Sequence, residues 1–347
     1  MNLPRSILNL AARSLRKHRR PELHPENPRI LVIRRNRMGD MICTLPLLHA
    51  LRKRFPTSRL TVACDPPGAP LARACGAVNE VIVLKTSWNR WASVFQNAAR
   101  FQNNDWVIAA KGGFDRRLAT LTRLTNAERR IGFESGMNLD SAYYTDPVAP
   151  PDDPNTEHQI ETMLRLLQPL GLPEAAIDLT ISLPPSAREF ASALLAQSPF
   201  VASPRFILIN ISSTTPLKFR PDDFIALTQR ILQATDLAVG FVAAPADQPK
   251  ARALAASLAS NRVVAIATPG PLELAALLER AAFLLTPEGG AAHLAATVDA
   301  PALILWSEGP FQKWRSRGAH HAFVRHEPGE DTIPLERVWQ ALQHYLA

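Results

Sequence analysis

The sequence predicts an α/β protein built from two Rossmann-like domains, each with a parallel sheet. Three observations lead to this prediction. Short, continuous apolar runs alternate with helical stretches, which is typical of parallel strands buried on both faces. The alternation occurs twice along the chain, and a length of 347 residues is long for a single domain.

The first alternation begins at residue 29 and contains four strand-like runs. They are "RILVI" (29–33), "RLTVAC" (59–64), "EVIVL" (80–84) and "DWVIAA" (105–110). Helical stretches follow these runs at 41–54, 70–75, 88–100 and 115–124. The proline-rich segment "PVAPPDDPNTE" (147–157) then suggests a connection between the domains.

The second alternation follows helical stretches near 156–169 and 186–196. Its strand-like runs are "RFILINI" (205–211), "LAVGFVAA" (237–244), "RVVAIA" (262–267), "FLLT" (283–286) and "APALILW" (300–306). Helices are expected at 221–234, 247–259, 271–281, 290–298 and 334–346.

These patterns divide the chain into four parts. They are a basic extension (1–28), an N-terminal Rossmann-like domain (29–180), a C-terminal Rossmann-like domain (181–333) and a closing helix (334–347). We expect the closing helix to pack back on the N-terminal domain. Open parallel sheets bind ligands at the carboxyl ends of their strands, so a cleft between the two domains is the expected site.

The formal net charge of +8 is concentrated near the N-terminus. Residues 1–20 carry no acid and six basic side chains: Arg5, Arg13, Arg16, Lys17, Arg19 and Arg20. The rest of the chain has 33 basic and 31 acidic residues, so we expect no nucleic-acid partner. Residues 1–20 also have an apolar helical face, which suits contact with an anionic membrane surface. A frayed extension without such a contact is an equally open alternative.

Cysteine usage and hydropathy place the protein in the cytoplasm. Cys43, Cys64 and Cys75 are widely spaced and form no CxxC pair, which indicates reduced thiols. No apolar run reaches the ~18 residues that a membrane span needs. We therefore expect a cytoplasmic protein that is peripheral on the inner face of the cytoplasmic membrane if residues 1–20 bind there.

The loop "RRNRMGD" leaves the first strand at its carboxyl end and contains one acid, Asp40. An aspartate here is either a helix N-cap or a functional carboxylate. The arginines 34, 35 and 37 would keep this acid ionised, as a general base requires. Gly39 would let the backbone turn tightly.

Two later loops carry groups that suit a phosphate ligand. In "ISSTTPLK", the hydroxyls of Ser213 and Thr214 precede the ammonium of Lys218, although an ordinary Ser/Thr-rich turn is the alternative. In "LLTPEGGAAHLAA", an acid and two glycines open a helix, whose first N–H groups can face a diphosphate. These residues are Glu288, Gly289 and Gly290, and the histidine one turn later, His293, is either a ligand or a structural residue.

In this order and spacing, the three segments resemble the glycosyltransferase family 9 heptosyltransferases of lipopolysaccharide core assembly. The family's G-D-x-x-x-x-x-P motif corresponds to Gly39, Asp40 and Pro46. Its K-x-W-P appears as "KFRP" (218–221) and its D-S-G-x-x-H-L-A as "EGGAAHLA" (288–295). The segments "DWVIAAKGGFDRR" and "RRIGF" are also similar, so the resemblance covers nearly the whole chain from residue 29.

The resemblance implies a GT-B fold and an inverting transfer that needs no metal and no cofactor. It implies a nucleotide-sugar donor such as ADP-heptose and a lipid-linked acidic glycan as acceptor. By the same resemblance, Asp40 is the catalytic base and Lys218 balances charge on the leaving diphosphate. The implied donor-binding residues are Ser213, Thr214, Asp247, Glu288, Gly289, Gly290 and His293. The implied acceptor-binding residues are Arg37, Lys111, Arg116 and Arg117, although a solvated helix start is an alternative explanation for the last three. The sequence contains no Asp-x-Asp, which agrees with a reaction that is independent of metal.

Three departures from the family pattern concern the donor half. Arg220 replaces a tryptophan, Glu288 an aspartate and Gly289 a serine or threonine. A catalytically inactive nucleotide-sugar-binding protein of the same fold is therefore an alternative. A two-domain sugar-nucleotide epimerase would need further acid and base residues. A dinucleotide dehydrogenase is disfavoured because no G-x-G-x-x-G follows the first strand.

Overall fold

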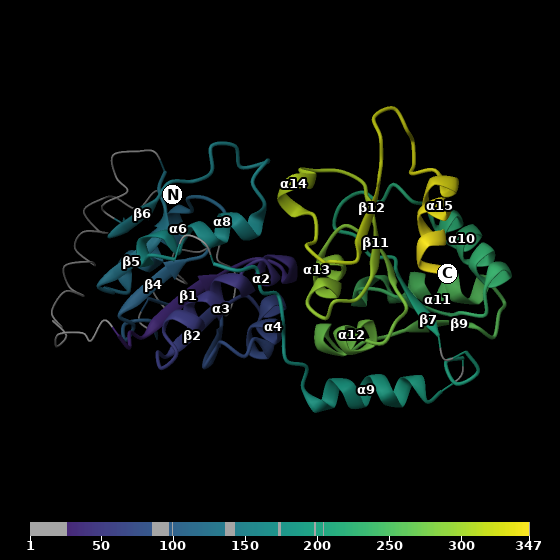
Figure 1. The fold of residues 1–347 in the computed structure, drawn as a ribbon, viewed down its shortest axis with the longest axis horizontal. Helices are drawn as coiled ribbons and strands as arrows, with labels where there is room; N and C mark the ends of the chain where they lie inside the picture. The colour runs from purple at the N-terminus through teal and green to yellow at the C-terminus, as the bar shows by residue number, and fades with distance from the viewer. Residues whose placement is uncertain are drawn as a thin grey trace. The chain divides into compact units, whose positions relative to one another are not determined.

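The fold is that of a computed structural model, which describes residues 26–84, 97–98, 100–135, 143–172, 175–197, 199–203 and 205–346. The chain forms two compact units, Met1–Leu179 and Thr180–Ala347. Figure 1 draws the first unit in purple to teal and the second in teal to yellow.

The first unit contains a six-stranded sheet in the order β3-β2-β1-β4-β5-β6. Its strands are β1 (Ile30–Arg34), β2 (Leu60–Cys64), β3 (Glu80–Val83), β4 (Trp106–Ala109), β5 (Arg129–Phe133) and β6 (Asp146–Val148). All neighbours are parallel. The first strand lies centrally, with Ile30 opposite both Leu60 of β2 and Trp106 of β4. The predicted parallel sheet is confirmed.

Helices α2 (Met38–Ile42) and α3 (Leu45–Arg54) stand where the sequence suggested one helix at 41–54. Pro46 explains the break, because its ring clashes with the carbonyl four residues earlier, at Ile42. The other helices of this unit include α4 (Ala69–Ala74), α6 (Arg116–Leu124) and α8 (Gln159–Arg165). The helix expected at 88–100 lies mostly outside the described residues.

The segment 147–157 is not the connection between domains that its prolines suggested. Residues Asp146–Val148 form β6, which pairs with β5 at the edge of the first sheet. An edge strand tolerates Pro147 because one side of its backbone needs no hydrogen-bond donor. The chain remains in the first unit until Leu179.

The second unit repeats the architecture with the strand order β12-β11-β10-β7-β8-β9. Its strands are β7 (Phe206–Asn210), β8 (Ala238–Val242), β9 (Val263–Ile266), β10 (Leu284–Pro287), β11 (Ala302–Trp306) and β12 (His321–Arg325). All neighbours are parallel. The sequence pattern missed β12, an edge strand that is only partly buried for most of its length.

The helices of the second unit lie close to their expected positions, with one exception. They are α9 (Pro185–Leu195), α10 (Pro221–Ala234), α11 (Gln248–Ser257), α12 (Pro271–Leu278), α13 (Gly290–Ala296), α14 (Phe311–Trp314) and α15 (Leu335–Leu346). The exception is the short α14, which was not expected. The packing expected for the closing helix is corrected. Val338 and Leu342 of α15 are fully buried in the core of the second unit, so its apolar stripe packs there.

Two predictions about the chain's environment can be compared with the structure. The three cysteines are free and buried, and burial raises the pKa of the Cys43 thiol to about 12. Within the described ranges, none of the helices has the length and apolar character to cross a membrane. The basic residues 1–20 lie outside those ranges.

Candidate active site

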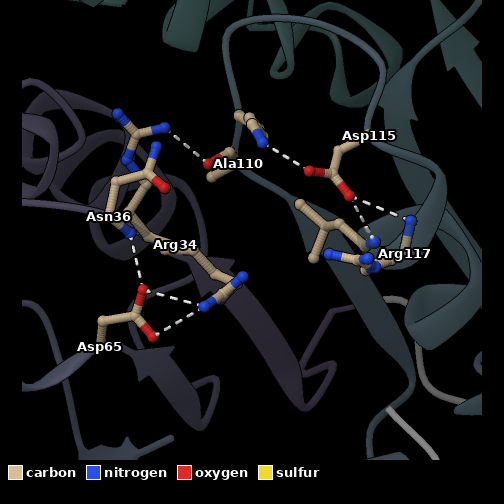
Figure 2. Close-up of polar contacts among 9 residues, drawn as sticks. Arg34, Asn36, Asp65, Ala110, Asp115 and Arg117 are labelled. Carbon is tan, nitrogen blue, oxygen red and sulfur yellow. Dashed lines mark hydrogen bonds and ion pairs between the residues drawn. The ribbon is translucent and has the colours of Figure 1, made fainter. Parts of the chain in front are cut away.

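The loop after β1 is held to the neighbouring strand β2 by an acid that the sequence analysis did not single out. Asp65 follows β2 and accepts a hydrogen bond from the backbone N–H of Asn36 at 2.8 Å. It also pairs with Arg35, whose Nη2 lies 3.4 Å from its carboxylate. Figure 2 shows the contact between Asp65 and Asn36. Asn36 has a φ of 89°, a left-handed conformation that asparagine adopts more readily than most residues. The loop therefore has a fixed turn before α2 begins.

Asp40 is the third residue of α2, and Arg37 occupies the N-cap position. The Oδ2 atom of Asp40 accepts from the backbone N–H of Arg37 at 3.2 Å, so the side chain caps the helix from inside the first turn. Its Oδ1 lies 2.7 Å from Nη2 of Arg34. The two readings of this acid are thus compatible, because capping leaves the carboxylate 15% exposed.

The three arginines of the loop have different partners. The side chain of Arg34 binds Asp40, whereas Arg35 pairs with Asp65 and Arg37 is exposed. Arg34 is 2% exposed and also donates to the carbonyl oxygen of Ala110, at the end of β4, at 2.8 Å. Burial lowers the pKa of Arg34, and the nearby Asp40 opposes that shift. The expectation that all three arginines surround Asp40 is therefore corrected to Arg34.

The segment after β4 brings further charged groups to the same edge of the sheet, since β1 and β4 are neighbours. Lys111 pairs with Asp115 at 2.5 Å, and Asp115 caps α6 by accepting from the N–H groups of Arg117 and Leu118. Burial raises the pKa of Asp115, but the three hydrogen bonds lower that pKa by more than burial raises it. The net shift is therefore downward. Arg116, the first residue of α6, is exposed.

The basic groups of this edge influence one another. Burial lowers the pKa of Arg35, and the attraction of Asp65 opposes this shift. Repulsion by Arg117 lowers the pKa of Arg35 as well. Arg117 therefore lies near enough to Arg35 for their charges to interact. Lys111 and Arg117, both predicted to bind the acceptor, thus follow β4, the strand next to β1, which precedes Asp40.

In the second unit, the predicted donor residues lie in loops that follow β7, β8 and β10. Ser213 and Thr215 share a hydrogen bond between their hydroxyls at 2.9 Å, and Ser213 Oγ also accepts from the N–H of Thr215 at 3.1 Å. Thr214 is exposed. The loop thus forms a hydroxyl-bonded turn that leaves one threonine directed to solvent.

Glu288, directly after β10, is 8% exposed and its carboxylate accepts three hydrogen bonds. The donors are the hydroxyl of Thr215 at 2.6 Å, the N–H of Ser307 at 3.0 Å and the N–H of Glu308 at 3.4 Å. This acid therefore joins the loops that follow β7, β10 and β11. The sequence pattern identified Glu288 but could not show these partners.

Asp247 ends a short 3-10 turn after β8 and is tied to the β7 loop. Its Oδ2 accepts from the Ser212 hydroxyl at 2.8 Å, and its Oδ1 pairs with Lys250 at 2.8 Å. The hydrogen bond from Lys250, and then that from Ser212, lower the pKa of Asp247. Asn210 extends the network by donating to Thr286 Oγ1 at 2.9 Å.

Gly289 and Gly290 open the short helix α13, as predicted. Gly289 has a φ of 141°, which disfavours any side chain there, and nothing lies within 4 Å of where its Cβ would be. The departure from the family's serine or threonine thus accompanies a backbone that suits glycine. His293 is 6% exposed within α13.

Lys218 lies at the end of the β7 loop. Its Nζ is 3.8 Å from an Oε1 of Glu308, and the two side chains are 29% and 51% exposed. Its backbone is fixed more firmly, because its N–H donates to Ser307 Oγ at 3.3 Å and its carbonyl accepts from Ile333 at 2.7 Å. Within the described parts of the chain, no group of three or more His, Cys, Asp or Glu residues is arranged to hold a metal ion.

The comparisons with known proteins agree on one family. The sequence profile of glycosyltransferase family 9 (heptosyltransferase) matches residues 94–333. Lipopolysaccharide heptosyltransferase 3 of Escherichia coli is 22% identical over 292 residues, which cover 80% of this chain and 83% of that protein.

Solved structures show the same fold. A family 9 glycosyltransferase from Veillonella parvula has a TM-score of 0.78 at 20% identity, over 92% of this chain and 97% of that one. The E. coli heptosyltransferase WaaC with ADP has a TM-score of 0.71 at 20% identity, over 91% and 99% of the two chains. A UDP-GlcNAc 2-epimerase from Methanocaldococcus jannaschii is less similar, with a TM-score of 0.56 at 13% identity. With two parallel six-stranded sheets and these structural neighbours, the fold is of the GT-B type. The chain belongs to glycosyltransferase family 9.

Proposed function

We propose that this enzyme transfers a heptose from ADP-heptose to a hydroxyl of a lipopolysaccharide core or a related surface glycan, with inversion and without a metal. The observation that carries the proposal is the placement of Asp40 at the carboxyl end of β1. The carboxylate is held by two donors and remains 15% exposed. A heptosyltransferase of this family from E. coli has been solved with ADP and with a fluorinated ADP-heptose, which supports the choice of donor.

Asp40 is assigned the role of general base. A carboxylate has about four lone-pair sites, and two of them accept from Arg34 and from the Arg37 N–H, so acceptor capacity is left for a hydroxyl proton. As the proton passes to Asp40, the acceptor oxygen bonds to the anomeric carbon from the face opposite the diphosphate. The bond from that carbon to the diphosphate oxygen breaks, and ADP leaves.

Lys218 is assigned to the leaving group. Negative charge grows on the diphosphate as its bond to the sugar breaks, and a nearby ammonium stabilises that charge. The 3.8 Å separation from Glu308 is long for an ion pair between partly exposed groups, so Lys218 can exchange this partner for a phosphate at little cost. The residues proposed to contact the diphosphate are Ser213, Thr214, Gly289, Gly290 and His293. Asp247 is proposed to contact the ribose hydroxyls.

Glu288 is assigned a supporting role on the donor side. Its three donors occupy most of its acceptor capacity, so it holds the loop of Ser213 and Thr215 to the Ser307 segment. We propose that its contribution to donor binding is made through this loop.

The acceptor is proposed to be acidic and linked to a lipid. Arg37, Lys111, Arg116 and Arg117 supply positive charge near Asp40, which suits phosphate or carboxylate groups on a glycan. Residues 1–20 are proposed to hold the enzyme at the inner face of the cytoplasmic membrane, where such an acceptor is anchored.

The test is a transfer assay that compares nucleotide sugars. Purified enzyme and a lipid-linked acidic core glycan are incubated together with one donor in each reaction. The donors are ADP-heptose and the UDP-, GDP- and dTDP-sugars. We expect ADP-heptose to give product and released ADP, at a rate that EDTA does not change. We also expect ADP-heptose, but not the other donors, to raise the melting temperature of the enzyme. Strong inhibition by EDTA would contradict a metal-free reaction. Stabilisation by another nucleotide sugar alone would reassign the donor.

A further inference from the structure

The buried guanidinium of Arg34 contacts three acceptors on two segments of the chain. Its Nε donates to the backbone carbonyl of Asp40 at 3.0 Å and its Nη2 to the carboxylate of the same residue at 2.7 Å. Its Nη1 donates to the carbonyl of Ala110 at 2.8 Å. Each of its nitrogens thus has a partner, and the side chain is 1% exposed.

Such an arrangement is poorly explained by stability alone. Removing an arginine and a carboxylate from water costs several kcal/mol per ion, and an apolar pair of similar volume is often as stable. The guanidinium, however, is a planar group with fixed donor directions. By binding both the backbone and the side chain of Asp40, it restricts rotation of the carboxylate about its own Cα–Cβ bond.

The third hydrogen bond extends this restraint to the acceptor side. Ala110 directly precedes Lys111, and Lys111 pairs with the cap of α6. One side chain therefore connects the base to the segment that carries three of the four proposed acceptor-binding residues. The connection runs between positions 76 residues apart in the sequence.

We propose that Arg34 is a positioning residue that aligns the Asp40 carboxylate with the acceptor hydroxyl and sets its position relative to the segment 110–117. This inference rests on the proposed role of Asp40 as the general base. Arg34 itself touches neither substrate in this proposal, because its nitrogens are occupied by protein acceptors. Its effect on the reaction passes through Asp40.

The unit offers a matched control for the loss of an arginine–carboxylate pair. Arg129 pairs with Asp146 at 2.6 Å and donates to the carbonyl of Pro169 at 2.9 Å. It is the first residue of β5, opposite Trp106 at the start of β4, whereas Arg34 is the last residue of β1. Arg129 therefore lies at the amino ends of the strands, away from Asp40.

The experiment compares Arg34→Met, Arg34→Lys and Arg129→Met in the transfer assay, with melting temperature and circular dichroism as folding checks. We expect Arg34→Met to lower kcat by about 10- to 100-fold, part of the 10²–10⁴ that a general base contributes, with the donor KM within twofold of wild type. Arg34→Lys keeps a charge and one donor, so kcat recovers in part. Arg129→Met should lower the melting temperature about as much as Arg34→Met does, but it should leave kcat unchanged.

The decisive measurement is a double-mutant cycle with Asp40→Asn. If Arg34 acts through Asp40, Arg34→Met has no further effect on kcat in the Asp40→Asn background. Multiplicative losses would show that Arg34 acts independently, and this proposal would be wrong. A folded Arg34→Met variant with kcat near wild type would also overturn it, and if that variant fails to fold, Arg34→Lys replaces it in the cycle. A near-normal rate for Asp40→Asn alone would instead contradict the role of Asp40.

Discussion

Two carboxylates follow buried strands in the two units, and their surroundings differ. Asp40 in the first unit accepts two hydrogen bonds, one from a buried guanidinium, and its side chain remains 15% exposed. Glu288 in the second unit accepts three hydrogen bonds, none of them from a charged group, and is 8% exposed. An acid with spare acceptor capacity can take a proton from a ligand, whereas a saturated acid holds loops together. The same residue class after a strand therefore has different expected roles.

The largest effect should come from Asp40→Asn. The amide is nearly isosteric but cannot accept a proton as a base, so we expect transfer to fall by about 10²–10⁴-fold. Donor binding, measured by calorimetry with ADP, should remain within twofold, because the proposed donor residues lie in the second unit. A rate near that of wild type would reduce Asp40 to a helix-capping residue and remove the contrast with Glu288.

Lys218→Ala should have the next largest effect. We expect kcat to fall by about 10²-fold, as for the removal of one group that stabilises charge in a transition state. Affinity for ADP should also fall by about tenfold, or ~1.4 kcal/mol. Arg230→Ala is the control, since Arg230 pairs with Glu336 on the outside of the same unit. Unchanged ADP affinity in the Lys218 variant would place this lysine outside the donor site.

Glu288→Gln tests whether Glu288, the second of the two carboxylates, holds its neighbouring loops together. The amide nitrogen cannot accept, so at least one of the N–H groups of Ser307 and Glu308 or the Thr215 hydroxyl loses its partner. We expect a loss of about 1–3 kcal/mol in the free energy of unfolding, measured by urea titration, and weaker ADP binding. Glu308→Gln, which alters an acid that is 51% exposed, should change stability by less than about 1 kcal/mol. Equal stability of the two variants would mean that Glu288 does not hold the loops.

Deleting residues 1–20 should have the smallest effect on the reaction. Transfer to a detergent-dispersed acceptor should be unchanged, because none of the proposed site residues lies in this segment. Attachment to anionic vesicles should weaken, since each basic residue contributes about 1 kcal/mol near such a surface. The fraction of each protein that co-sediments with anionic vesicles at rising salt measures this attachment. Neutral phosphatidylcholine vesicles are the control. Equal co-sedimentation of the two proteins would leave residues 1–20 without a membrane role.

The sequence predicted most of the fold because burial on both faces leaves a clear pattern. Helix α10 was expected at 221–234 and is found at Pro221–Ala234. The sequence pattern missed β5, which begins with two arginines and contains a glycine. Two further misses were β6 and β12, which are edge strands. Strand β6 contains a proline and β12 is only partly buried for most of its length, so neither forms a continuous apolar run.

The candidate site was less predictable than the fold. Motif spacing located Asp40, Lys218 and the glycines at the start of α13, since each follows a recognisable strand. It could not show that Arg34 binds Ala110, because that contact depends on β1 pairing with β4. A charged residue at the end of a continuous apolar strand was the available signal. Asp65 gave a weaker one, as a lone acid in a proline-rich turn.

In the proposed role of Lys111 as an acceptor-binding residue, its pair with Asp115 would make recognition an exchange of one anion for another. An acidic group that binds Lys111 must displace an internal carboxylate which is already held at 2.5 Å. Asp115 keeps its two backbone donors in α6 when it releases the lysine, so the helix start survives the exchange. A neutral glycan would not compete with the Asp115 carboxylate for Lys111, and dissolved salt would weaken both ion pairs. In the proposed role of Lys111, the helix cap of the first unit would thus favour acidic acceptors over uncharged ones.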